Sequence, residues 1–233
     1  YLLKRYVFHE SGTLVSGIIG GLYSSTATIS VLARKSRKAS EQEATDYVAA
    51  MLLAISMMFL RFMILILIFS REIFLSIYPY LLTMAVVAAI VAWFIHSRQK
   101  RSNDQPVEEE EDDSSNPLEF KVALIFAVLF VIFTFLTHYT LVYAGTGGLN
   151  LLSFVSGFSD ITPFILNLLQ NTGSVAALII TACSMQAIIS NIMVNMFYAL
   201  FFAGKGSKLR PWILGGFGVV IACNLVLLLF FYV

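Results

Sequence analysis

Long apolar stretches, separated by shorter polar segments, make up most of this chain. A helix needs about 20 mostly apolar residues to cross the hydrocarbon core of a bilayer, and seven stretches meet that requirement. The predicted spans cover residues 12–33, 45–70, 74–97, 119–144, 148–170, 174–203 and 211–233. The sequence therefore predicts an all-α fold, a polytopic transmembrane helical bundle of about seven spans.

Two of these spans, 12–33 and 148–170, have polar centres. The first carries several glycines and then a run of serines and threonines, and the second carries Gly157, Asp160 and Pro163. Proline removes a backbone donor and kinks or breaks a helix. In lipid, freed backbone groups are tolerated only against protein or a watery cavity. We therefore expect both helices to be interrupted.

The two polar spans also match each other in sequence. When residues 16–29 are laid on residues 152–165, Gly21 meets Gly157 and Ser24 meets Asp160. The spans that follow also match, with residues 55–61 over 189–195, and a plain apolar span follows each pair. This order predicts two pseudo-repeats with interrupted polar helices.

The predicted repeats are transmembrane domains joined by a polar segment. The first covers residues 1–97, an acidic hydrophilic linker covers residues 98–118, and the second repeat covers residues 119–233. One extra span lies between the repeats, so the simplest count gives them the same orientation. Internal repeats that hold interrupted helices are the usual construction of secondary transporters.

Basic residues give a prediction of orientation. If span 12–33 ends in the cytoplasm, eight loop Lys and Arg residues lie inside and six outside, which favours a cytoplasmic C-terminus. An alternative stays open, in which span 148–170 is re-entrant and the basic cluster from Lys205 to Arg210 moves inside.

Composition supports the membrane assignment and narrows the chemistry. Hydrophobic residues make up 58% of the chain and charged residues 12%, so lipid is the solvent for most of it. The net charge of +1 indicates no nucleic-acid partner. Cys183 and Cys223 both fall within predicted spans, where small packing residues are expected. Cys and His residues form no cluster with metal-ligand spacing, so we expect no cofactor and no enzymatic activity, and we assign no metal ligands.

The residues from Gly20 to Thr28, the basic segment that follows them, and the stretch ending at Arg61 resemble a bacterial membrane family of unknown function. Proteins of that family usually carry this domain after an MgtC/SapB-type membrane domain and are often labelled as magnesium transporters. The resemblance implies an integral, multi-pass protein of the bacterial inner membrane, with a further membrane domain upstream. Asn195 departs from the pattern, because the resemblance implies a lysine there.

Only Arg61 and Asp160, among the charged residues, fall deep within predicted spans. An ion at the bilayer centre costs at least about 2.5–3.5 kcal/mol, so such residues face the bundle interior. Two interpretations remain open: a buried pair that locks the halves together, or a cation or proton site at Asp160 that Arg61 tunes. Supporting hydroxyl and amide groups complete the candidate ion pathway, namely Ser24, Ser25, Thr28, Thr162, Asn167, Asn191 and Asn195.

From these features we expect a membrane transporter of a small ion or polar solute, such as a divalent cation, or a proton-coupled carrier. Hydroxyl, amide and carboxylate oxygens suit a hard cation. The alternative is a non-transporting regulatory or assembly module, which would use the same polar groups for helix packing. We expect the partners to be the lipid bilayer, a small cation or polar solute, a second copy in a homodimer formed through glycine faces, and the upstream membrane domain.

Overall fold

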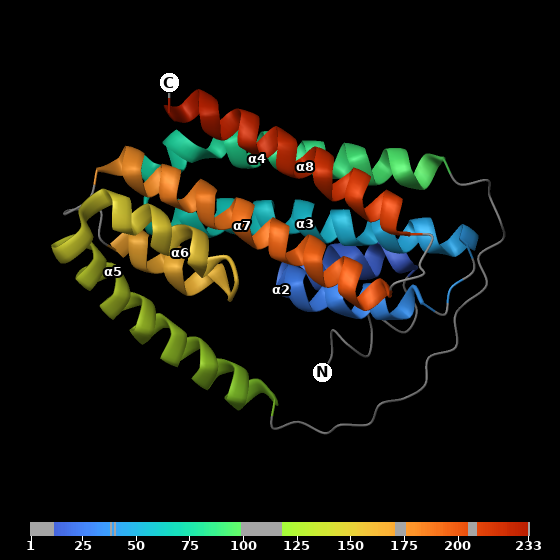
Figure 1. Cartoon of the computed structure of the whole chain (residues 1–233), viewed down its shortest axis with the longest axis horizontal. Helices are drawn as coiled ribbons and strands as arrows, with labels where there is room; N and C mark the ends of the chain where they lie inside the picture. Colours follow the sequence, from blue (N-terminus) through green and yellow to red (C-terminus); the bar gives the residue numbers. More distant parts are fainter. Residues whose placement is uncertain are drawn as a thin grey trace. The chain divides into compact units, whose positions relative to one another are not determined.

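The computed structural model describes residues 12–37, 39, 41–98, 118–170, 176–204 and 209–232. Within these ranges the chain is all-helical, as expected from the sequence (Figure 1). The helices are α2 (Thr13–Lys35), α3 (Glu41–Phe69), α4 (Arg71–Ser97), α5 (Leu118–Ser156), α6 (Ile161–Gln170), α7 (Ala177–Ala203) and α8 (Arg210–Tyr232). The acidic run from Glu108 to Asp113 lies outside the described residues.

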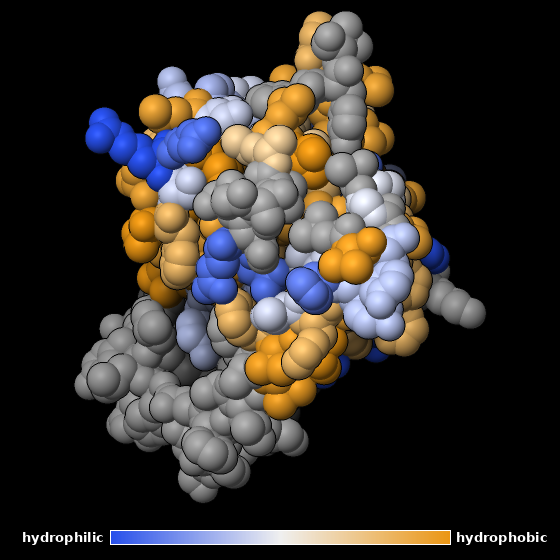
Figure 2. Space-filling model, turned by 90° about the vertical axis from the view of Figure 1, so that its left-hand side faces the viewer, coloured by the Kyte–Doolittle hydropathy of each residue, from blue (hydrophilic) through white to orange (hydrophobic). Residues whose placement is uncertain are grey.

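Five of the described helices are long and apolar enough to cross a membrane, by length and composition: α2, α3, α4, α7 and α8. Shorter apolar helices cover Phe130–Thr140, Gly147–Ser156 and Ile161–Gln170. Large apolar side chains are widely exposed, including Ile68 at 73% and Phe230 at 77%, as expected of surfaces that face lipid. Hydrophobic residues also cover much of the surface in Figure 2. The chain is thus a membrane-helical protein, but the predicted number of seven spans is not found.

The chain forms two compact units. The first contains residues 1–65, 77–107 and 192–233, and the second contains residues 66–76 and 108–191. Each unit holds one of the two polar-centred segments, and each is described separately below. The boundaries 1–97, 98–118 and 119–233 are of a different kind and remain predictions.

Helix α2 is interrupted at its centre, as the sequence predicted. Ser24 is extended, with φ −156° and ψ 106°, and it divides α2 into one arm of residues 13–23 and another of residues 25–35. The first arm runs parallel to α3, because Gly17 lies against Ala50 and Gly21 lies against Ala54.

The second arm of α2 turns back toward the start of α3. If it continued past Ala54 along α3, Lys35 would lie about 40 Å from Glu41 at 1.5 Å per residue. The six peptide links between these residues reach about 21 Å at most. Figure 1 shows the arms of α2 doubling back. We call residues 13–35 hairpin 1 and residues 23–25 its tip.

A second hairpin lies in the other unit. Gly145 has φ 56° and ψ −148°, a conformation that favours glycine, and it breaks α5 into two parts. The part after the break ends at Ser156, and α6 begins at Ile161 and packs against α5. In Figure 1 this last part of α5 and α6 run in opposite directions and join at one end. We call residues 147–170 hairpin 2 and residues 157–160 its tip.

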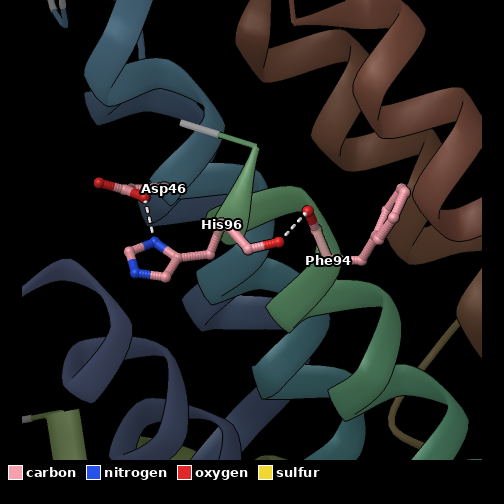
Figure 3. Close-up of polar contacts among 4 residues, drawn as sticks. Asp46, Phe94 and His96 are labelled. Carbon is pink, nitrogen blue, oxygen red and sulfur yellow. Dashed lines mark hydrogen bonds and ion pairs between the residues drawn. The ribbon is translucent and has the colours of Figure 1, made fainter. Parts of the chain in front are cut away.

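Several helix ends of the first unit gather at one level, which we call the basic end. Arg37 donates from Nε to the carbonyl of Phe202 and from Nη2 to that of Phe201, at 3.2 Å, so the end of α7 lies beside the end of α2. Asp46, near the start of α3, contacts Nδ1 of His96, near the end of α4, at 2.7 Å (Figure 3). The start of α3 and the ends of α2, α4 and α7 therefore share this level.

Candidate functional site at the tips of two helical hairpins

The tip of hairpin 1 is held by one side chain from α3 and one from the tip itself. Arg61 donates from Nη1 to the carbonyl oxygen of Tyr23 at 2.7 Å, where the first arm ends. The Ser24 Oγ accepts a hydrogen bond from the backbone N–H of Ala27 at 3.3 Å, as an N-cap does at a helix start. A cation thus lies at the carbonyl end of one arm, and a neutral hydroxyl lies at the N–H end of the other.

Glycine contacts bring hairpin 1 close to α3. A Cβ atom at Gly17 would lie 2.3 Å from the carbonyl oxygen of Ala50, and one at Gly21 would lie 2.5 Å from the Cα of Ala54. Only glycine permits backbones to approach this closely, as in the small-residue interfaces of membrane helices. This close approach brings the tip within reach of Arg61.

The tip of hairpin 2 is held in a similar way by α7. Asn191 donates from Nδ2 to the carbonyls of Gly157, at 3.2 Å, and Ser159, at 3.5 Å. The Ser190 hydroxyl donates to the carbonyl of Phe154 at 2.6 Å. Three carbonyls near the end of the first arm therefore receive hydrogen bonds from two neighbouring side chains of α7.

Asp160 caps the second arm of hairpin 2. Its Oδ1 accepts a hydrogen bond from the backbone N–H of Thr162 at 2.9 Å, and the side chain is exposed. A carboxylate at a helix N-terminus also interacts favourably with the helix dipole. Here the anion lies at the N–H end of an arm, and a neutral amide lies at the carbonyl end.

The remaining predicted residues are divided between the units. Ser25 and Thr28 are buried on the second arm of hairpin 1, and Asn195 is buried on α7 in the same unit. Asn167, 1% exposed on α6, donates from Nδ2 to the Thr134 hydroxyl at 2.8 Å. Arg61 belongs to the first unit and Asp160 to the second, so the predicted pairing of these two residues remains untested.

Sequence reasoning missed two features of these tips. It gave no role to Ser190, which bonds hairpin 2 and lies against Gly157, and it did not identify the backbone carbonyls of Tyr23, Gly157 and Ser159 as acceptors. The aligned glycines were the available signal, because a glycine in a span marks a close approach of backbones.

The fold and the tips define a class of membrane-helical protein that contains two interrupted helical hairpins. The chain belongs to the family described as a domain of unknown function (DUF4010), which matches residues 1–203. An uncharacterized protein of Aquifex aeolicus (strain VF5) is 25% identical over 224 residues, which cover 95% of this chain and 96% of that protein. No solved structure matches the chain. The resemblance to a family of unknown function is confirmed, and its association with an MgtC/SapB-type domain remains an expectation.

Proposed function

We propose that this protein transports a small ion or polar solute across the bacterial inner membrane. The observation that carries the proposal is the pair of hairpin tips. Their arms have 11 or 10 residues and extend about 15 Å, which is half of a typical hydrocarbon core. Interrupted backbone at that depth is stable only against protein or a water-filled path. Transporters commonly form their substrate sites with such broken helices.

Equivalent geometry at the two tips supports an internal repeat. Gly21 and Ala54 are in close contact in hairpin 1, and Gly157 and Ser190 are in close contact in hairpin 2. The differences 157 − 21 and 190 − 54 are both 136 residues. The same offset relates Ser24 to Asp160, which both cap a second arm, and Tyr23 to Ser159, whose carbonyls both accept a side-chain bond. We infer that the hairpins are corresponding elements of two pseudo-repeats.

The corresponding tips differ in charge, and the difference suggests separate roles. Hairpin 1 carries Arg61 at its tip, whereas hairpin 2 carries Asp160. A carboxylate with one oxygen bonded to a backbone N–H keeps a second oxygen for a cation or a proton. We assign Asp160 to the ion pathway, with Asn191 holding the backbone around it. The pathway role extends to Ser24, Ser25, Thr28, Thr162, Asn167 and Asn195, and no catalytic residue or cofactor is assigned.

A flux measurement tests this proposal. The purified chain would be reconstituted into liposomes loaded with a Mg²⁺-sensitive or pH-sensitive dye, and Mg²⁺, other divalent cations and protons would be applied outside. Protein-free liposomes and liposomes with heat-denatured protein serve as controls. We expect flux of at least one ion above both controls. Equal flux in all three preparations, with the protein folded, would contradict transport of these ions and favour a regulatory or assembly module.

Partners form a separate part of the proposal. The bilayer is the required environment. Homodimerisation through glycine faces and an upstream MgtC/SapB-type domain are proposals that the reconstituted chain can test. Cross-linking in liposomes would show a dimer band if copies associate.

A further inference from the structure

We propose that the two hairpins enter the membrane from opposite faces, with hairpin 1 on the cytoplasmic face and hairpin 2 on the external face. The inference concerns direction, and each step uses contacts within one unit together with the continuity of single helices.

Hairpin 1 opens at the basic end. Its first arm runs parallel to α3, from Gly17 beside Ala50 to Gly21 beside Ala54, and its second arm returns to the start of α3. Both Thr13 and Lys35 therefore lie at the end of the unit where α3 begins. Although α2 is long enough to cross a membrane, this path places both of its ends on one face.

Helix α7 ends at the same basic end. Arg37, two residues beyond α2, donates to the carbonyls of Phe201 and Phe202 in the last turn of α7. Because α7 is one continuous helix of 27 residues, about 40 Å long, its first residue, Ala177, lies at the opposite face.

Hairpin 2 opens where α7 begins. Cys183 contacts Asn150 through its Sγ, and Ser190 further along α7 contacts Phe154, so the first arm runs parallel to α7. If α6 continued in that direction, Gln170 would lie about 35 Å from Ala177, and the seven links between them reach about 25 Å. Hairpin 2 therefore opens on the face opposite to hairpin 1.

The positions of basic residues identify the cytoplasmic face. Arg34, Lys35 and Arg37 follow hairpin 1 at the basic end, Arg98 follows α4 and Arg210 starts α8. Loops rich in Lys and Arg stay on the cytoplasmic side. The proposed path then crosses the membrane in α3, α4, the part of α5 before Gly145, α7 and α8. It places the C-terminus outside and makes the repeats inverted, whereas the span count from the sequence gave a parallel pair and a cytoplasmic C-terminus.

The inverted arrangement has a consequence for mechanism. In transporters with inverted repeats, corresponding elements lead to a midplane site from opposite faces. We assign hairpin 1 to access from the cytoplasm and hairpin 2 to access from outside. The topology stands independently of transport, because its test needs no flux.

Cysteine labelling tests the topology. Both native cysteines would be replaced by alanine, and single cysteines would be placed at exposed positions: Gly12, Glu72, Arg98, Gly147 and Gln170. A membrane-impermeant maleimide would be applied to right-side-out and inside-out vesicles. We expect Gly12→Cys and Arg98→Cys to react only in inside-out vesicles, and Glu72→Cys, Gly147→Cys and Gln170→Cys only in right-side-out vesicles.

Each contrary result overturns a defined part. Reaction of Gly12→Cys and Arg98→Cys at opposite faces would show that α2 crosses the membrane. Reaction of Gly147→Cys and Gln170→Cys at opposite faces would show that hairpin 2 crosses. Reaction of Gln170→Cys and Arg98→Cys at one face would overturn the inverted arrangement. Full labelling in detergent and an unchanged melting temperature are required of each variant.

Discussion

Gly157 lies so close to Ser190 that a Cβ atom on residue 157 would be 2.3 Å from the Ser190 Oγ and 2.7 Å from the backbone nitrogen of Asn191. This contact places the tip of hairpin 2 within hydrogen-bonding distance of Asn191. The same relationship recurs at Gly21 and Ala54, which hold hairpin 1 beside α3.

We predict that Gly157→Ala lowers the stability of the protein by about 1–3 kcal/mol, the usual cost of overpacking. Adding Ser190→Gly should restore part of the loss, because it removes the two nearest side-chain atoms and leaves the backbone contact. Melting temperature in detergent measures both effects. Gly147→Ala is the matched control, since a Cβ at that position has no neighbour within 4 Å. An equal effect of Gly147→Ala would argue against the contact.

Gly21→Ala should destabilise the protein without rescue by Ala54→Gly. The added Cβ would meet the Cα of Ala54 at 2.5 Å and its carbonyl oxygen at 2.8 Å, and both are backbone atoms. A melting curve of the single and double variants checks this. Recovery in the double variant would show that the two helices can separate at little cost.

Arg61→Met should lower stability by about 1.5–3 kcal/mol, the range for a hydrogen bond with a charged donor. The substitution removes the 2.7 Å bond to Tyr23 and keeps an apolar side chain of similar length. Arg61→Lys keeps one charged donor and should lose less. Thermal unfolding of the two variants gives the comparison, and equal melting temperatures for Met and the wild type would show that Arg61 does not hold the tip.

Tyr80→Phe should destabilise the helix bundle of the first unit by about 1–3 kcal/mol, because it leaves a buried acceptor unsatisfied. The Tyr80 hydroxyl donates to Oδ1 of Asn224, and both side chains are buried on α4 and α8. Tyr139→Phe is the control, since Tyr139 is 64% exposed. Equal melting temperatures for the two variants would contradict a structural role for this bond.

The sequence was sufficient to predict the helices and the places where two of them break. Glycine, serine and aspartate at positions 21, 24, 157 and 160 interrupt otherwise apolar stretches, and the structure has its breaks there. These features are local, because they depend on backbone conformation and capping at a few residues. Local signals survive in a single sequence.

Whether a broken helix spans or turns back was beyond the sequence. Residues 13–35 have the same length and hydropathy in either case, and the direction after Ser24 depends on contacts with α3. The register of the following helices was also ambiguous. Laying residues 55–61 on 189–195 uses an offset of 134 residues, whereas the tip contacts use 136. Apolar helices align almost equally well at several offsets, because their side chains differ little.

The most direct test of the central claim compares Asp160→Asn with Asp160→Ala in the flux assay and in thermal unfolding. Asparagine is as good an N-cap as aspartate, while alanine loses about 1 kcal/mol. The account predicts that Asp160→Asn keeps a melting temperature close to that of the wild type and abolishes flux, and that Asp160→Ala loses both stability and flux. Wild-type flux in Asp160→Asn would show that the carboxylate lies off the ion pathway and would contradict the account.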